Sequence, residues 1–336
     1  YKTQRRYFIL MPVIPSTYKP KGPFKNSHFN TIFAAKIRRV YGVKQKRERL
    51  VLIDEDFIDI DWSFPQNTKG NSKIVLLFHG LEGTAKRTYM LGTIKQLLDN
   101  GYHCAAVNLR SCSGEINSKL RSYHSGASED VAEIISHINT KYNDSSLYLC
   151  GFSLGGNLIL KYLGEERERP SNLAAAVAIS TPVDLYDSLG ALEKPGNWVY
   201  RWSFLKDLRA KYKMKLSHYP EHLTLDNYKK IRSLRLFDEY YTAPAHGFTD
   251  ALDYYTKSSS RQFLKNIKLP VLLLNAKDDS FLNEKCYPVD LSANHEYLHL
   301  EMPERGGHVG FISGKGITYN EKRTLEFFNA QAHCNS

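Results

Sequence analysis

Short apolar runs alternate with amphipathic stretches along most of this 336-residue chain. Runs typical of strands buried on both faces occupy residues 73–78, 103–109, 146–150, 174–180, 270–276 and 297–302. Helical patterns stand between several of them, at residues 86–98, 128–142 and 156–163, and Ser128 is the expected N-cap of the second. Because parallel strands need long crossover connections, this alternation predicts an α/β fold with a mostly parallel central sheet and helices on both faces.

Two segments depart from this alternation. Residues 49–53 and 57–62 place apolar and polar side chains at alternate positions, which predicts a hairpin at a sheet edge. Residues 183–259 are helical in character and rich in aromatic side chains, and they separate the strand ending near Ser180 from the strand beginning near Val271. We therefore predict an N-terminal arm and edge hairpin (1–66), a core built from residues 67–182 and 260–336, and an inserted helical cap (183–259).

The cysteines and the longest apolar runs bear on the location of the protein. No run of 18 apolar residues occurs, so we expect no membrane-spanning helix. The five cysteines are odd in number and lack C-x-x-C spacing, and two of them fall in predicted core strands. This pattern predicts reduced thiols and a cytoplasmic location.

The chain carries a net charge of +11, with basic residues concentrated at 36–39, 44–47 and 201–215. No recognised nucleic-acid-binding motif accompanies them, and we expect no nucleic-acid partner. A solvated basic surface is the simpler interpretation. The alternative is attraction to an acidic substrate or to anionic lipid, with peripheral contact to a membrane.

The stretch Gly151-Phe152-Ser153-Leu154-Gly155 lies between a buried strand and a helical pattern. A bare G-x-S-x-G is a weak signal, since three such positions recur by chance in roughly one in ten chains of this length. The order strand, motif, helix is more specific, because it is the context of a nucleophile elbow. Ser153 is therefore the candidate nucleophile, with its hydroxyl exposed at the positive end of a helix.

A second glycine-containing loop follows the strand at residues 73–78. It reads His79-Gly80-Leu81-Glu82-Gly83, and a loop in this place supplies one backbone N–H of an oxyanion hole. The second donor is the N–H that follows the nucleophile. Leu81 and Leu154 are thus the candidate donors, and the alternative for the first is an ordinary glycine turn.

A serine nucleophile in this architecture needs an acid and then a histidine further along the chain. Asp278 and Asp279 both follow the predicted strand at 270–276. We favour Asp279, since it stands three residues after the small residue Ala276, as the acid does in related loops. His308, with glycines on both sides, is the candidate base because an imidazole titrates near neutral pH.

The segment His295-Glu296-Tyr297-Leu298-His299 matches H-E-x-x-H, a zinc-protease pattern. That chemistry requires a helix, whereas this segment alternates as a strand. Two residues four apart on a strand are about 13 Å apart, too far to share one zinc at about 2 Å per bond. We therefore expect no metal site here and no metal requirement for activity.

Eight stretches together resemble the YheT-like family of α/β hydrolases, whose relatives include embryogenesis-associated hydrolases, yeast medium-chain fatty-acid ethyl ester synthases/esterases and animal phospholipases. The stretches are residues 24–28, 79–83, 110–115, 123–126, 151–157, 237–248, 276–279 and 306–311. The resemblance implies the α/β-hydrolase fold and the triad Ser153, Asp279 and His308. The chain departs from the family at Ser280, where a proline commonly follows the acid.

These observations predict a serine hydrolase of small-molecule or lipid esters with short to medium acyl chains, without metal or organic cofactor. The cap would bind the acyl chain through an apolar inner face, and Trp198, Trp202 and Phe204 lie close together in it. Two alternatives stay open. An alcohol acyltransferase would use the same acyl-enzyme, and a non-catalytic binding protein would use the same fold.

Overall fold

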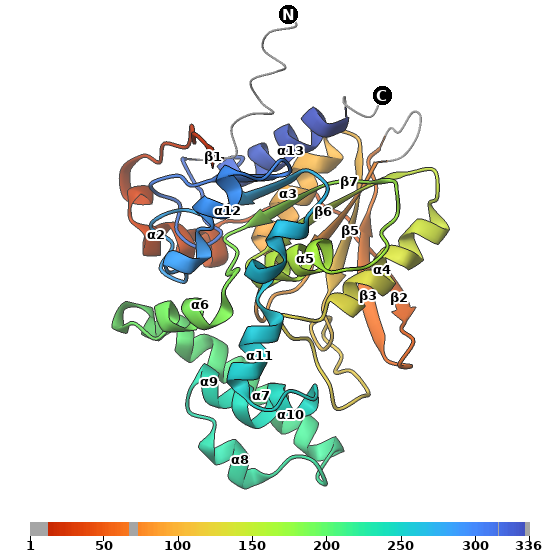
Figure 1. Ribbon diagram of the computed structural model, residues 1–336, viewed down its shortest axis with the longest axis vertical. Helices are drawn as coiled ribbons and strands as arrows, with labels where there is room; N and C mark the ends of the chain where they lie inside the picture. The colour runs from red at the N-terminus through yellow and green to blue at the C-terminus, as the bar shows by residue number, and fades with distance from the viewer. Residues whose placement is uncertain (1–12, 67–72, 315, 333–336) are drawn as a thin grey trace, which may run out of the picture.

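The computed structural model describes residues 13–66, 73–314 and 316–332, and it contains one nine-stranded sheet (Figure 1). Its strand order is β1-β9-β8-β7-β6-β4-β5-β3-β2. The strands are β1 (Val13–Ile14), β2 (Lys46–Val51), β3 (Phe57–Ser63), β4 (Lys73–Phe78), β5 (Tyr102–Asn108), β6 (Ser146–Phe152), β7 (Leu173–Ile179), β8 (Val271–Leu274) and β9 (Leu298–Glu301). All neighbours pair in parallel except β2 with β3 and β3 with β5. The predicted mostly parallel sheet flanked by helices is confirmed.

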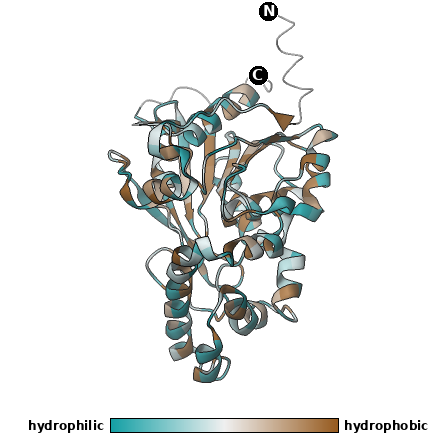
Figure 2. Ribbon diagram, turned by 90° about the vertical axis from the view of Figure 1, so that its left-hand side faces the viewer, coloured by the Kyte–Doolittle hydropathy of each residue, from teal (hydrophilic) through white to brown (hydrophobic). Residues whose placement is uncertain are grey.

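Helices cover the sheet on both faces because the central strands are apolar on both sides. Helices α3 (Thr88–Leu98) and α13 (Tyr319–Ala332) pack with the strand side chains of one face. Helices α4 (Ser128–Lys141) and α5 (Leu154–Gly164) pack with those of the other face. Figure 2 shows brown strands between helices that carry both colours. Each fully buried aliphatic side chain in these two layers stabilises the fold by about 1.5–3 kcal/mol.

The two edges of the sheet differ in how well the sequence predicted them. The hairpin of β2 and β3 forms one edge and is confirmed. At the other edge β1 pairs in parallel with β9, which the pattern did not indicate because two residues carry no measurable periodicity. After β1 the arm folds into η1 (Gly22–Lys25), α2 (Ser27–Ile32) and η2 (Phe33–Ile37).

The predicted N-cap at Ser128 is wrong. Ser128 is the first residue of α4, and Ala127 occupies the N-cap position without a capping side chain. The Ser128 hydroxyl instead donates to Glu165 Oε2 at 2.7 Å. Tertiary bonding to a carboxylate thus replaced the local cap that the sequence suggested.

Residues 183–259 form a helical lobe below the sheet (Figure 1). Its elements are α6 (Leu185–Leu192), η3 (Pro195–Asn197), α7 (Trp198–His218), α8 (Leu225–Lys230), α9 (Leu234–Phe237), η4 (Asp238–Thr242), α10 (Ala243–Ala245) and α11 (Ala251–Ser258). They share a hydrophobic cluster of their own, with Leu208, Tyr212 and Phe237 among its buried members. After the lobe come η5 (Ser260–Asn266), η6 (Glu284–Cys286) and α12 (Val289–Ala293).

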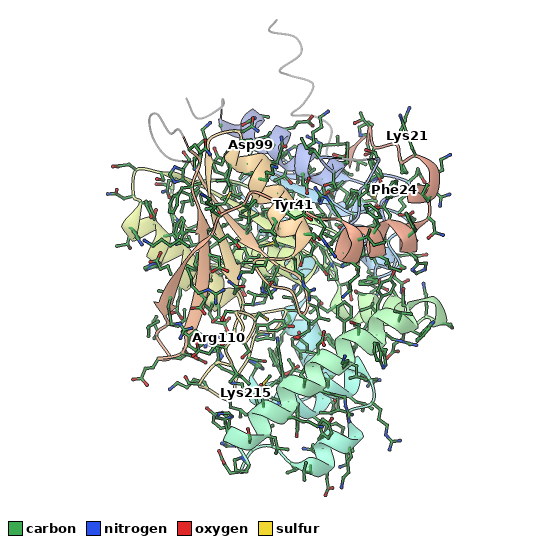
Figure 3. The ribbon with its side chains drawn as sticks, turned by 180° about the vertical axis from the view of Figure 1, so that it is seen from behind. Lys21, Phe24, Tyr41, Asp99, Arg110 and Lys215 are labelled. Atoms are coloured by element: carbon green, nitrogen blue, oxygen red, sulfur yellow. The ribbon has the colours of Figure 1, made fainter. Side chains whose placement is uncertain are left out.

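Lys215 of α7 ties the lobe to the core. Its ammonium is buried and donates to the carbonyl oxygens of Asn117, at 2.7 Å, and of Lys119. Arg110, buried nearby, pairs with Asp130 at 2.8 Å (Figure 3). Burial lowers the pKa of Lys215 to about 8. Helix α7 is therefore hydrogen-bonded to the loop that follows β5.

Among the described residues, no helix is both long and apolar enough to cross a bilayer. Cys104, Cys112, Cys150 and Cys286 are buried and free. Cys334 lies outside the described residues.

Candidate active site

Ser153 stands at a strained turn between β6 and α5. Its φ is +53°, a left-handed conformation that costs a non-glycine residue about 1–3 kcal/mol. The flanking glycines are required, because a Cβ on Gly151 would lie 2.4 Å from the Gly155 oxygen and one on Gly155 would lie 2.3 Å from the Phe78 oxygen. The local sequence therefore holds the Ser153 hydroxyl at the carboxyl end of the central strands.

His308 and Asp279 meet this serine. His308 Nε2 lies 2.9 Å from Ser153 Oγ, and His308 Nδ1 lies 2.9 Å from Asp279 Oδ2 and 3.1 Å from Asp279 Oδ1. Asp279 is 3% exposed. The backbone N–H of His308 donates to Thr31 Oγ1 at 2.8 Å, so the arm helix α2 holds the histidine loop in place. The structure thus brings the three predicted residues into one hydrogen-bonded chain.

Asp278 has a different place. Its Oδ1 accepts the backbone N–H of Gly307 at 2.9 Å. The described carboxylate that the His308 ring contacts is that of Asp279 and not that of Asp278. Burial raises the pKa of the Asp278 carboxyl above its usual value. Asp278 braces the glycine turn before the histidine, whereas Asp279 contacts the imidazole itself.

The loop after β4 lies against the nucleophile. A Cβ on Gly80 would come within 3.0 Å of Ser153 Cβ. The N–H of Gly80 donates to the Tyr89 hydroxyl at 3.2 Å, and that of Glu82 donates to the Tyr123 hydroxyl at 2.9 Å. Among the described residues, no protein acceptor is found for the N–H groups of Leu81 and Leu154, the two donors predicted for an oxyanion hole.

His79 braces this loop and is neutral. Its Nε2 accepts the backbone N–H of Leu109 at 3.1 Å, which places the ring proton on Nδ1, 2.8 Å from the Gly80 oxygen. Burial lowers the pKa of His79 to about 3. The ring therefore joins the loops after β4 and β5 and has no free nitrogen for proton transfer.

A buried ionic cluster beside this loop was missed by the sequence analysis. Lys211 of α7 places its Nζ 2.8 Å from Glu82 Oε1 and 3.3 Å from Cys112 Sγ. The Tyr123 hydroxyl donates to the same Glu82 Oε1 at 2.6 Å. Lys211 is 129 positions from Glu82 along the chain, and its neighbours read as a solvated basic helix, so no local pattern indicated the contact.

An apolar pocket opens above Ser153 and His308, and the helical lobe forms much of its wall. Its lobe side includes Leu185, Leu189, Phe204, Leu208, Phe237 and Tyr255. Lys211 and Asp238 are the charged side chains in the lining, which also contains the imidazoles of His124 and His308. Tyr255 and Thr242 donate to Asp238 at 2.7 and 2.6 Å, and burial raises the pKa of this carboxyl to about 6.

The expectation that Trp198 and Trp202 contribute to this wall is wrong. Both side chains face solvent, at 63% and 62% exposure, and only Phe204 of the aromatic trio lines the pocket. Helix geometry explains the difference, because residues follow one another at about 100° around the axis, so that Trp202 points about 200° and Trp198 about 120° away from Phe204.

The loop after Asp279 is held by packing where the family commonly has proline. The Phe281 ring stacks on the His308 ring, with 4.1 Å between their centroids. The Ser280 carbonyl accepts from Asn197 Nδ2 at 2.6 Å, and the Phe281 carbonyl accepts from the Ser188 hydroxyl at 2.7 Å. Two hydrogen bonds from the lobe therefore fix this backbone.

The H-E-x-x-H segment does not form a helix. His299 lies within β9, and His295 precedes it and accepts backbone N–H groups from Tyr297 and Leu298. Within the ranges that the structure describes, no group of three or more His, Cys, Asp or Glu side chains is arranged to hold a metal ion.

Comparison with known proteins matches residues 73–314 to the family model described as the alpha/beta hydrolase fold. Over 298 residues the chain is 34% identical to the YheT protein of Escherichia coli, covering 88% of this chain and 87% of that protein. It is 29% identical over 328 residues to phospholipase ABHD3 of Mus musculus, covering 95% and 80% of the two chains. A solved esterase of Pyrococcus furiosus, 18% identical, aligns over 88% of this chain and 96% of its own with a TM-score of 0.54.

Proposed function

Because the chain belongs to the alpha/beta hydrolase fold family, we propose that it is a serine hydrolase of carboxylic esters that works through an acyl-enzyme. The observation that carries the proposal is the hydrogen-bonded chain from Ser153 through His308 to Asp279 beside an apolar pocket. The phospholipase among its relatives supports an ester or lipid substrate.

The proposed reaction uses each contact once in acylation and once in deacylation. His308 Nε2 removes the Ser153 proton as Oγ attacks the acyl carbonyl, and Asp279 holds the imidazole and stabilises its charged form. The N–H groups of Leu81 and Leu154 bind the oxyanion of the tetrahedral intermediate. His308 then gives its proton to the leaving alcohol, and water attacks the acyl-enzyme with His308 again as base.

We further propose that the lobe, residues 183–259, acts as a cap over the acyl chain and sets the substrate preference. Each methylene buried against an apolar wall contributes about 0.8 kcal/mol, so kcat/KM should rise roughly threefold to fourfold per carbon until the pocket is full. We expect the optimum at short to medium acyl chains in a p-nitrophenyl ester series. A flat profile from acetyl to octanoyl esters would contradict the cap.

A pair of variants on α7 makes this test specific. Leu208→Trp fills the pocket and should move the optimum to shorter chains. Leu205→Trp places the same bulk on the same helix, in a groove that does not contain Ser153. It should leave the optimum where it is in the unaltered protein, and an equal shift in both variants would mean that bulk on α7 acts without filling the pocket.

The Lys211–Glu82 contact should position the oxyanion loop. In Lys211→Met the Glu82 carboxylate keeps only Tyr123 and lies buried without its cation, so the loop that carries Leu81 should shift. Removing one oxyanion donor outright lowers kcat by about 10²–10³. We expect a smaller loss of kcat, about tenfold to 100-fold, with little change in KM, and a matching loss of affinity for a boronic acid that mimics the tetrahedral intermediate.

The double variant Glu82→Gln/Lys211→Met is the control for stability, because it removes both charges together. Breaking one partner of a buried pair costs about 3–5 kcal/mol, whereas replacing both is often close to neutral. Thermal unfolding should therefore recover in the double variant. If the single variant loses stability but keeps its full kcat, Lys211 has a structural role only.

Alcohol acyl transfer is the second candidate, since a dry pocket would favour an alcohol over water as the attacking group. Product analysis with added ethanol distinguishes the two reactions. Acid as the main product supports hydrolysis, and ethyl ester as the main product supports transfer. A protein that forms neither, and that no fluorophosphonate labels, would be a binding protein on this fold.

A further inference from the structure

Helix α7 presents two different faces. Its inner face lines the pocket with Phe204, Leu208 and Lys211, which follow one another at intervals of four and three residues. Figure 3 shows α7 as the long helix on the side of the lobe that is turned toward the viewer. An ordinary surface helix carries polar side chains on its outer face. On α7 the outer face begins with Trp198, Val199 and Trp202, at 63%, 45% and 62% exposure.

The rest of this outer face is basic. Lys206 and Lys213 are exposed and continue the line of Trp198 and Trp202 along the helix. Lys206 Nζ lies 5.5 Å from the centre of the Trp202 ring. The whole helix contains six Lys and Arg residues and a single acidic one, Asp207. Tryptophan rings are enriched at membrane interfaces, and exposed lysines are attracted to anionic lipid.

The cations at this face are not neutralised by neighbouring carboxylates. Lys206, Arg209, Lys213 and Arg232 line a surface groove together with the apolar side chains of Leu205 and Ile231. Within the described ranges, none of the four basic side chains makes an ion pair.

On the edge hairpin, by contrast, the arginines are matched by acidic side chains. Arg47 and Arg49 on β2 pair with Asp61 and Asp59 of β3 at 2.7 and 2.8 Å. The lysines on the outer face of α7, Lys206 and Lys213, are therefore free to attract an anionic surface, whereas the arginines of the hairpin are already compensated. Together with the exposed tryptophans, this favours a lipid surface over a purely solvated helix.

We propose that the outer face of α7, made of Trp198, Val199, Trp202, Lys206 and Lys213, docks on bilayers that contain anionic phospholipid. The indole rings would enter the headgroup region while the lysines contact lipid phosphates. The same helix would then contact the membrane through its outer face and line the pocket with its inner face. This binding does not depend on the proposed ester hydrolysis and is measured separately from it.

Flotation with vesicles tests the docking directly. The full chain should float with vesicles of phosphatidylcholine and phosphatidylglycerol, and only weakly with phosphatidylcholine alone. One lysine near an anionic leaflet strengthens partitioning about fivefold, so Lys206→Glu/Lys213→Glu should lower it by at least about 25-fold. Trp198→Ala/Trp202→Ala should also release the protein. Raising the salt from about 0.1 M to about 1 M shortens the Debye length to about 3 Å and should weaken binding of the unaltered chain.

Tryptophan fluorescence locates the contact. The chain has three tryptophans, and the third, Trp62, is 3% exposed. A blue shift on adding anionic vesicles must therefore come from Trp198 and Trp202, and it should be absent from the double alanine variant.

Lys265→Glu/Lys268→Glu is the matched charge control. Both lysines are exposed, and Lys268 lies just before β8 begins, at the end of the sheet opposite the strand ends that lead to Ser153. This variant should bind vesicles within about threefold of the unaltered protein, less than the fivefold expected for one interfacial lysine. Equal losses in both charge variants would overturn the assignment. Undiminished flotation of Trp198→Ala/Trp202→Ala would also overturn it. The same holds if the unaltered protein self-associates without lipid and the tryptophan substitutions abolish that self-association.

Discussion

Replacing Ser153 with alanine is expected to lower kcat by a factor on the order of 10⁴ to 10⁶, by analogy with other serine triads. The expected size follows from the geometry, because Ser153 Oγ is the atom that His308 Nε2 reaches at 2.9 Å. Without the hydroxyl, the pocket and the oxyanion donors can still bind the substrate but cannot form an acyl-enzyme. KM should change little, so the loss should fall on kcat in a p-nitrophenyl butyrate assay.

Covalent labelling identifies the serine independently of the rate. A fluorophosphonate should add to Ser153 in the unaltered protein and to no residue in Ser153→Ala. Ser125→Ala is the matched control, since Ser125 lines the same pocket but lies outside the hydrogen-bonded chain with His308. It should keep both the label and most of the activity. An adduct mapped to Ser125, or to any other serine, would refute the proposed nucleophile.

The sequence predicted those features of the fold and site that local patterns encode. Strands buried on both faces, such as β4 and β6, are continuous apolar runs and stand out without any knowledge of their partners. Ser153 and His308 could be named for a similar reason, because each is flanked by glycines that its own backbone turn requires. Strand β1 could not be found, since its two residues depend on β9 for their conformation.

Contacts between distant segments were beyond the sequence patterns. The ion pair of Lys211 with Glu82 joins the lobe to the loop after β4, and nothing near either residue distinguishes it from a solvated charge. The direction of the tryptophans on α7 was missed for a related reason. Trp198 and Trp202 point about 120° and 200° away from Phe204 around the helix axis, and aromatic content alone does not say which side of a helix meets the pocket. Burial of one face is decided by tertiary packing.

The two neighbouring aspartates should differ sharply when each is changed to asparagine. Asp279→Asn should lower kcat by about 10⁴, the size of loss known for the equivalent change in a serine-protease triad. The amide can donate to His308 Nδ1, which favours the tautomer that carries its proton on Nε2. A ring in that tautomer cannot accept the proton of Ser153, although the geometry of the site is preserved.

Asp278→Asn should lower kcat by less than about tenfold. Asp278 Oδ1 accepts the Gly307 N–H at 2.9 Å, and an amide oxygen can still accept this bond. One such neutral hydrogen bond changes stability by only about 1 kcal/mol. The two substitutions are isosteric and adjacent, so each is the control for the other in expression, folding and substrate binding. Steady-state kcat at one pH and thermal unfolding of both variants are sufficient measurements. Equal losses of kcat, or a larger loss in Asp278→Asn, would mean that contact with the imidazole does not define the acid. The ordering follows from which carboxylate faces His308 Nδ1, because both side chains carry the same charge and stand one residue apart.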